Sequence, residues 1–222
     1  MSIEKVLVLR DTSVGRKALV ALSGVALFGF VILHMLGNLQ VFAGSEALNG
    51  YARALRKVPE LLWAARLGLI VAVVVHIWAS LSLVARSNAA RPVEYRKKRD
   101  LATGYAARTM RWSGPLILVF VAFHLAHLTW PGLDLGGAHD PHDVYANVVA
   151  GFSVPWVTAI YIVAQIVLGL HLHHGAWSLF QSLGVSHPRY AHLRTWIPRG
   201  FALAVVAGNI AMPLAVLVGI VR

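Results

Sequence analysis

Four histidines, His34, His76, His124 and His171, lie one to a segment inside long apolar stretches of this 222-residue chain. Imidazole is costly in hydrocarbon unless it is hydrogen-bonded or bound to a metal, so a histidine at that depth indicates a functional site. Four such histidines in two pairs are what two bis-histidine haems would require. Cysteine is absent, which excludes thiolate ligation, covalent haem attachment and cysteine-held iron–sulfur clusters within this chain.

Neighbouring histidines compete for the same roles. His127 is three residues from His124 and shares its helical face. A match of depth with His34 favours His127, whereas a repeated Ser-Gly dipeptide favours His124, because residues 23–24 and 113–114 stand at equal distances before His34 and His124. The competitors of His171 are His173 and His174.

Membrane-spanning helices are needed to position these side chains. The chain is 58% hydrophobic and 13% charged, which is the composition of an integral membrane protein. Five stretches are long enough to cross a hydrocarbon core of about 30 Å as helices. They cover approximately residues 17–43, 62–86, 110–131, 153–181 and 197–221. We therefore expect one all-α domain, residues 1–222, in which five transmembrane helices form a bundle around two b haems.

The basic residues predict the orientation. Of 20 Lys and Arg, 15 lie in the N-terminal segment and in the second and fourth connections, which should face the cytoplasm. The third connection has three acids and no basic residue, as expected of the outer side. We expect a multi-pass protein of the bacterial inner membrane with a cytoplasmic N-terminus. Because topology accounts for the net charge of +11, nucleic acid is not an expected partner.

The first connection carries basic residues on the predicted outer side. Ser45 is the expected N-cap of a helix, and apolar residues with helical spacing follow it, which favours a helix lying in the membrane interface. A plain basic loop is the alternative.

Depth and direction suggest how the histidines pair. At 1.5 Å per residue, His34 lies about 25 Å and His76 about 15 Å from the cytoplasmic edge, so they cannot share one haem. His124 and His171 both lie about 20 Å deep, which leaves their partners undecided. Helices one and three carry their histidines toward the outer end, and helices two and four carry theirs in the cytoplasmic half. This direction favours an outer pair, His34 with His124, and an inner pair, His76 with His171.

The sequence around the histidines resembles a known family. The strings are ILHMLGN, VVHIWAS, FVAFHLAHLTW and GLHLHHGAWSLF. With five spans in this order, they resemble the five-helix, two-haem cytochrome b anchor of succinate dehydrogenases and related fumarate reductases, over residues 16–220. The resemblance implies that His34 and His124 bind the outer haem, that His76 and His171 bind the inner haem, and that His127 is not a ligand.

The resemblance also implies a function. Electrons from succinate would pass through a flavoprotein and an iron–sulfur subunit on the cytoplasmic face, then through the inner and outer haems to a quinone, usually menaquinone. This chain would be a subunit of succinate:quinone oxidoreductase without the catalytic head, and would not oxidise succinate alone. A higher oligomer of the complex is left open. Some relatives carry a proton-conducting glutamate where this chain has Gly169, which argues against that route here.

Candidate contacts of the quinone and of the haem propionates are less specific. Possible quinone contacts near the outer pair are Asn38, Gln40, His127 and Trp130. Possible propionate partners are Arg16, Lys17, Arg108 and Arg111 on the inner side and Arg53 and Arg56 on the outer side. Each has an ordinary alternative: Trp130 as an interfacial anchor, and the basic residues as determinants of topology or partners of lipid headgroups.

Two loops contain further candidate binding residues. The outer loop offers His139, Asp140, His142 and Asp143 to a divalent metal, although turn formation is the more common use of such residues. The basic run 94–100 is a candidate contact of the iron–sulfur subunit or of anionic lipid.

The alternative functions are a di-haem cytochrome b of a hydrogenase or formate dehydrogenase, and a haem-free transporter with histidine proton relays. The transporter predicts further acids in the membrane, and the five spans contain essentially none.

Overall fold

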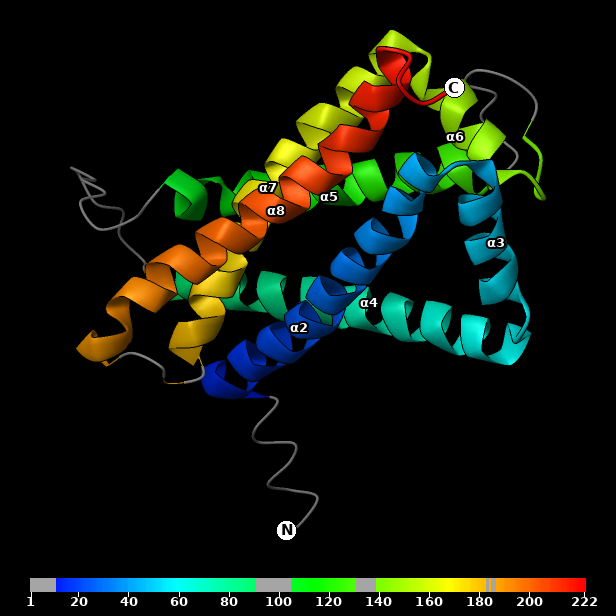
Figure 1. The fold of residues 1–222 in the computed structure, drawn as a ribbon. Coiled ribbons are helices and arrows are strands. Elements are labelled where there is room, and N and C mark those ends of the chain that lie inside the picture. Colours follow the sequence, from blue (N-terminus) through cyan, green and yellow to red (C-terminus); the bar gives the residue numbers. More distant parts are fainter. Residues whose placement is uncertain (1–10, 91–104, 131–138, 183, 185–186) are drawn as a thin grey trace.

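The computed structural model describes residues 11–90, 105–130, 139–182, 184 and 187–222. All regular structure within these ranges is helical (Figure 1). The basic run 94–100 lies outside the described residues. The elements are α2 (Ser13–Asn38), η1 (Leu39–Ala43), α3 (Ser45–Arg56), α4 (Pro59–Ala89), α5 (Tyr105–Leu128), α6 (Val144–Phe152), α7 (Pro155–Ser182), η2 (Pro188–Tyr190) and α8 (Ala191–Leu217).

Five helical stretches are long and apolar enough to cross a membrane, as predicted. They are Ser13–Ala43, Pro59–Ala89, Arg108–Leu128, Pro155–Ser182 and Pro188–Leu217. The predicted end of the last span, residue 221, is four residues too late. Gly219 adopts a φ of +75°, and the Ile220 N–H bonds the Ala215 carbonyl at 2.8 Å, which closes α8 with a glycine cap.

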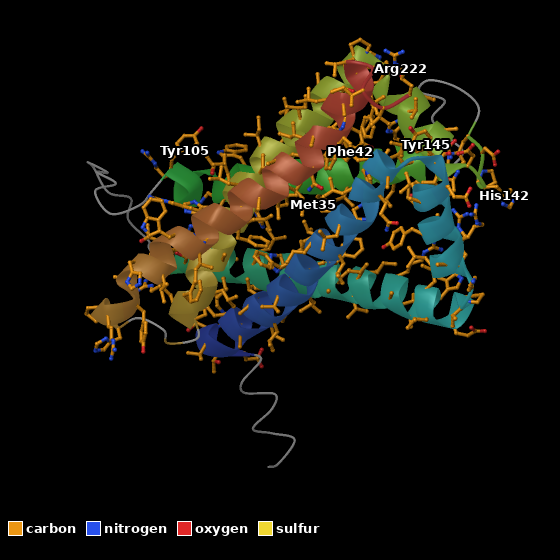
Figure 2. All side chains as sticks on the ribbon, in the orientation of Figure 1. Met35, Phe42, Tyr105, His142, Tyr145 and Arg222 are labelled. Atoms are coloured by element: carbon orange, nitrogen blue, oxygen red, sulfur yellow. The ribbon has the colours of Figure 1, made fainter. Side chains whose placement is uncertain are left out.

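The spanning helices form two hairpins with α8 packed against them. α2 packs along α4, and α5 packs along α7. α8 packs mainly on α7 and more lightly on α2, which crosses it at Met35 (Figures 1 and 2). Each of the two hairpins therefore contains two of the four helices that carry the intramembrane histidines.

The first connection contains the predicted helix, α3, instead of a plain loop. The predicted N-cap is one residue late, because Gly44 caps the helix and Ser45 is its first residue. Gly44 has a φ of +95°, a conformation that glycine adopts without steric cost, and it turns the chain from η1 into α3. Leu48 is buried on one face of α3, and Arg53 and Arg56 are exposed.

Hydrogen bonds join α3 to α6 at the same end of the bundle (Figure 1). The Asn49 amide donates to Asp143 Oδ1 at 2.9 Å and accepts from the Tyr145 N–H at 3.0 Å. The Tyr145 hydroxyl donates to the carbonyl of Arg222, so the C-terminus is tied to the same place (Figure 2). The Ala146 N–H and the Asn49 amide hold the pKa of Asp143 below its ordinary value. Because its side chain accepts from the Ala146 N–H, Asp143 is the N-cap of α6.

The polar loop before α6 makes turns and caps. Asp140 accepts from the His142 N–H at 2.7 Å, and Asp143 caps α6. Within the described ranges, no group of three or more His, Asp or Glu stands close enough to hold a metal ion. The turn interpretation therefore describes this loop, and the divalent-metal hypothesis gains no support.

Candidate functional site

The four intramembrane histidines meet in two facing pairs. His34 on α2 faces His124 on α5, with ring centroids 5.7 Å apart and an interplanar angle of 85°. His76 on α4 faces His171 on α7, with ring centroids 6.3 Å apart and an interplanar angle of 60°. These are the outer and inner pairs expected from depth and direction, and the two names are kept below for the residues alone.

Each pair joins helices that are not closely packed against each other. Among the described elements, close packing links α2 to α4 and α5 to α7, and neither α2 with α5 nor α4 with α7 belongs to the closely packed pairs. Each pair is therefore built from one histidine of each hairpin. The two imidazoles project toward each other between helices that stay apart.

The ring separations leave room for a metal ion between the two imidazoles of each pair. A metal–imidazole bond of about 2.0 Å on each side, added to the distance from the nitrogen to the ring centre, places the centroids of two opposed imidazoles about 6 Å apart. The observed 5.7 and 6.3 Å agree with this separation. Two histidines in the axial positions would leave no open position on iron, which suits electron transfer better than oxygen activation.

Serine hydroxyls hold both imidazoles of the inner pair. Ser23 Oγ on α2 lies 3.1 Å from His76 Nδ1, and Ser113 Oγ on α5 lies 3.1 Å from His171 Nδ1. Ser23 Oγ also lies 2.6 Å from the Leu19 carbonyl, and with its proton donated there it would accept from His76 Nδ1–H. This tautomer leaves the lone pair of His76 Nε2 available to a metal.

These contacts explain the repeated Ser-Gly dipeptide. α2 and α5 each give one serine to an inner histidine and, eleven residues later, one histidine to the outer pair. The repeat therefore reflects two hairpins that use the same positions in the same way. The Ser-Gly repeat thus marks the serines that contact the inner histidines, and it also sets the depth of the outer histidines.

The two imidazoles of the outer pair have unlike partners. His124 Nδ1 lies 3.1 Å from the Tyr161 hydroxyl, which also lies 2.9 Å from His127 Nδ1. His34 has no such partner in these contacts; its Nε2 accepts from the Asn38 amide at 3.1 Å. A metal at His34 Nε2 would take the place of that amide hydrogen. Asn38, a predicted quinone contact, is thus bonded to a candidate ligand.

The structure separates His124 from its competitor. His127 is 6% exposed, and its ring packs against Phe123, Phe152 and Tyr161. A Cβ added to Gly151 would collide with the His127 ring, so the glycine lets α6 approach α5 there. His124, and not His127, is the imidazole that faces His34. The assignment of His127 as a quinone contact stays a prediction.

The remaining predicted contacts do not converge on one place. Gln40 is half-buried in η1, and Trp130 is 57% exposed at the end of α5. Lys17, Arg108 and Arg111 have exposed side chains. Arg16 lies over the ring of Trp78, 5.6 Å from its centroid, and Arg53 and Arg56 bond Glu46 and the Pro141 carbonyl. The quinone and propionate assignments therefore stay predictions.

Sequence reasoning missed Tyr161 and the polar contacts of α8. Tyr161 is 5% exposed and lies 34 residues or more from both histidines that it meets, so no local spacing marked it. The Asn209 amide of α8 donates to Gln165 of α7 at 2.9 Å, and Arg194 lies over the ring of Trp177. The only feature of the sequence that could have indicated these contacts was a polar residue inside an apolar span.

Gly169 has a packing role. A Cβ added there would collide with Val206 of α8, because the two helices meet at this point. A side chain at residue 169 would therefore require Val206 to shift.

Comparisons of the chain with protein-family models, with curated proteins and with solved structures gave no match.

Proposed function

We propose that this chain is the di-haem cytochrome b membrane anchor of a succinate:quinone oxidoreductase. The observation that supports this function best is the meeting of four intramembrane histidines in two facing pairs, with ring separations of 5.7 and 6.3 Å. The sequence strings around the same histidines resemble that family. The proposed partners are an iron–sulfur subunit and a flavoprotein subunit on the cytoplasmic face.

In this proposal the inner pair, His76 and His171, and the outer pair, His34 and His124, are the axial ligands of two b haems. When bound, these haems supply one-electron transfer across the membrane toward a quinone, for which menaquinone is the expected type. The chain orients the ligands through Ser23 and Ser113 on the inner side. All four histidines lie within the apolar spanning stretches.

The acid content of the spans favours this function over a proton-relay transporter. Glu60, at the start of α4, is the only Asp or Glu within the five spanning stretches. Proton relays through membranes use chains of Asp, Glu and His, and no carboxylate accompanies the histidine pairs here. A cytochrome b of a hydrogenase or formate dehydrogenase would use the same pairs, so partner identity separates it from the proposal.

Purification of the intact complex from its native membrane tests the function. We expect copurification of a polypeptide with covalently bound flavin, succinate oxidation, and haem absorption bands that succinate reduces. Bands reduced by hydrogen or formate instead would support the related dehydrogenases. A complex without haem would contradict all three cytochrome assignments.

A further inference from the structure

Tyr161 stands between two histidines of α5 and bonds both of them. We propose that Tyr161 and His127 are positioning residues of the outer ligand His124, joined in a directed hydrogen-bond chain from His124 through Tyr161 to His127. This inference rests on the proposed function, because it gives His124 the role of an axial ligand. It assigns His127 a role that is neither ligation nor quinone binding.

Counting protons fixes the direction of the chain. The Tyr161 hydroxyl has one proton, yet its oxygen lies 3.1 Å from His124 Nδ1 and 2.9 Å from His127 Nδ1. It can donate to only one of the two histidines, and its proton is used only if it donates to one and accepts from the other. A His124 that binds metal through Nε2 keeps its proton on Nδ1 and must donate. Tyr161 then donates to His127 Nδ1, and all three groups are satisfied in this order alone.

Burial makes this chain a fixed part of the site. Tyr161 is 5% exposed and His127 is 6% exposed, and Phe152, fully buried, packs edge-on against both rings. Phe120 closes the other side, where it contacts His124 and Tyr161. Water cannot readily replace either bond in such a place, and neighbouring hydrogen bonds in a dry network strengthen one another.

The chain should lower the reduction potential of the outer centre. An acceptor at Nδ1–H makes the opposite nitrogen of a ligating imidazole more basic, which favours the more highly charged ferric state. The other outer ligand lacks this support, because the described hydrogen bond of His34 comes from the Asn38 amide, a donor to Nε2. Tyr161 is therefore the residue through which the protein can act on the outer centre.

Potentiometric titration of the intact complex, followed by visible absorption and by the ferric electron paramagnetic resonance signals, tests this inference. Tyr161→Phe keeps the aromatic ring and removes the hydroxyl. We expect two haems per chain and a higher outer potential, by about 59 mV for a tenfold change in the ratio of ferric to ferrous affinity. The inner potential should stay unchanged. His34→Ala identifies the outer signal by removing it.

Two further variants keep the test decisive. His127→Leu leaves Tyr161 in place and removes its acceptor, so it should shift the outer potential in the same direction by a smaller amount, even if Tyr161→Phe fails to accumulate. Ser113→Ala, the matched control, should shift the inner potential only. Two haems with an unchanged outer potential and signal in both Tyr161→Phe and His127→Leu would overturn the inference and leave the proposed function intact. A wild-type complex without haem would overturn both.

Discussion

The inner and outer histidine pairs use the same side chains and differ in what holds them. Both inner imidazoles are bonded at Nδ1 by a serine hydroxyl, one from each hairpin. In the outer pair, His124 is held by the Tyr161–His127 chain, whereas His34 meets the Asn38 amide through Nε2. The inner pair is thus held symmetrically and the outer pair on one side only.

If the proposed function holds, this difference would make the two redox centres unequal on one helical plan. With identical axial ligands, the remaining influences on potential are hydrogen bonds to the ligands, burial and nearby charge. The repeated hairpin fixes the positions of all four histidines. Tyr161, which comes from α7 and has no counterpart in the repeat, makes the two pairs unlike.

Substitution of a histidine ligand should give the largest effect, a loss of haem, and it should distinguish the inner pair from the outer pair most clearly. His76→Ala should remove the inner haem and His34→Ala the outer one, so that each complex retains about half of the wild-type haem, because one imidazole cannot complete a bis-histidine site. His173→Ala, which alters a neighbour of His171, serves as the control and should retain both haems. Haem-to-protein ratios measure this outcome. Retention of both haems in either ligand variant would refute the assignment.

Filling the contact between α7 and α8 should disturb the inner pair more than the outer pair. Gly169 lies two residues before His171 and meets Val206, so Gly169→Leu overpacks this contact at a cost of about 1–3 kcal/mol. We expect a lower thermal midpoint and preferential loss of the inner haem signal. Gly68→Leu is a suitable control, because a Cβ there meets nothing within 4 Å. Equal loss from both centres would show that α8 supports them alike.

Removal of one serine tests the symmetry of the inner pair. If each serine hydroxyl accepts from Nδ1–H of its ligand, Ser23→Ala and Ser113→Ala should both raise the inner potential, by similar amounts and with no change at the outer centre. Ser→Thr variants retain the hydroxyl and should stay near the wild-type potential. Potentiometric titration measures these shifts. A shift in only one alanine variant would break the proposed symmetry.

Acid should weaken the end of the bundle that holds α3 and α6, and this effect should be the smallest of the four. Hydrogen bonds from Ala146 N–H and the Asn49 amide lower the pKa of Asp143 below its ordinary value of 3.8. A lowered pKa means that Asp143 stabilises the folded state above pH 3.8, and that this contribution is lost as pH falls through the lower folded value. The protection factors for hydrogen exchange in the first turn of α6 should then fall below pH 4. In Asp143→Asn the same exchange should lose this pH dependence.

The sequence was sufficient to predict the spans and the histidine pairs. Apolar length located all five helices, because a membrane span leaves a long uninterrupted signal, and the direction of each helix paired His34 with His124 and His76 with His171. The depth match with His34 favoured His127, which lies one helical turn from His124, whereas the Ser-Gly repeat favoured His124. Their packing against Phe152 and Gly151, far along the chain, makes that distinction.

The partners of the ligands were not predictable from local spacing. Tyr161 meets His124 across 37 residues, and the choice depends on how α5 and α7 are rotated against each other. The Ser-Gly repeat did carry the positions of Ser23 and Ser113, but their contacts with His76 and His171 need the hairpin geometry. Gly44 replaced Ser45 as the cap of α3 because the turn after η1 requires a positive φ.

Haem content and its redox titration in the wild-type complex test the central claim most directly. The account predicts two low-spin b haems per chain that titrate as two separate one-electron transitions, one of which disappears in His34→Ala and the other in His76→Ala. A complex without haem, or one whose haem content is unchanged in both variants, would contradict it.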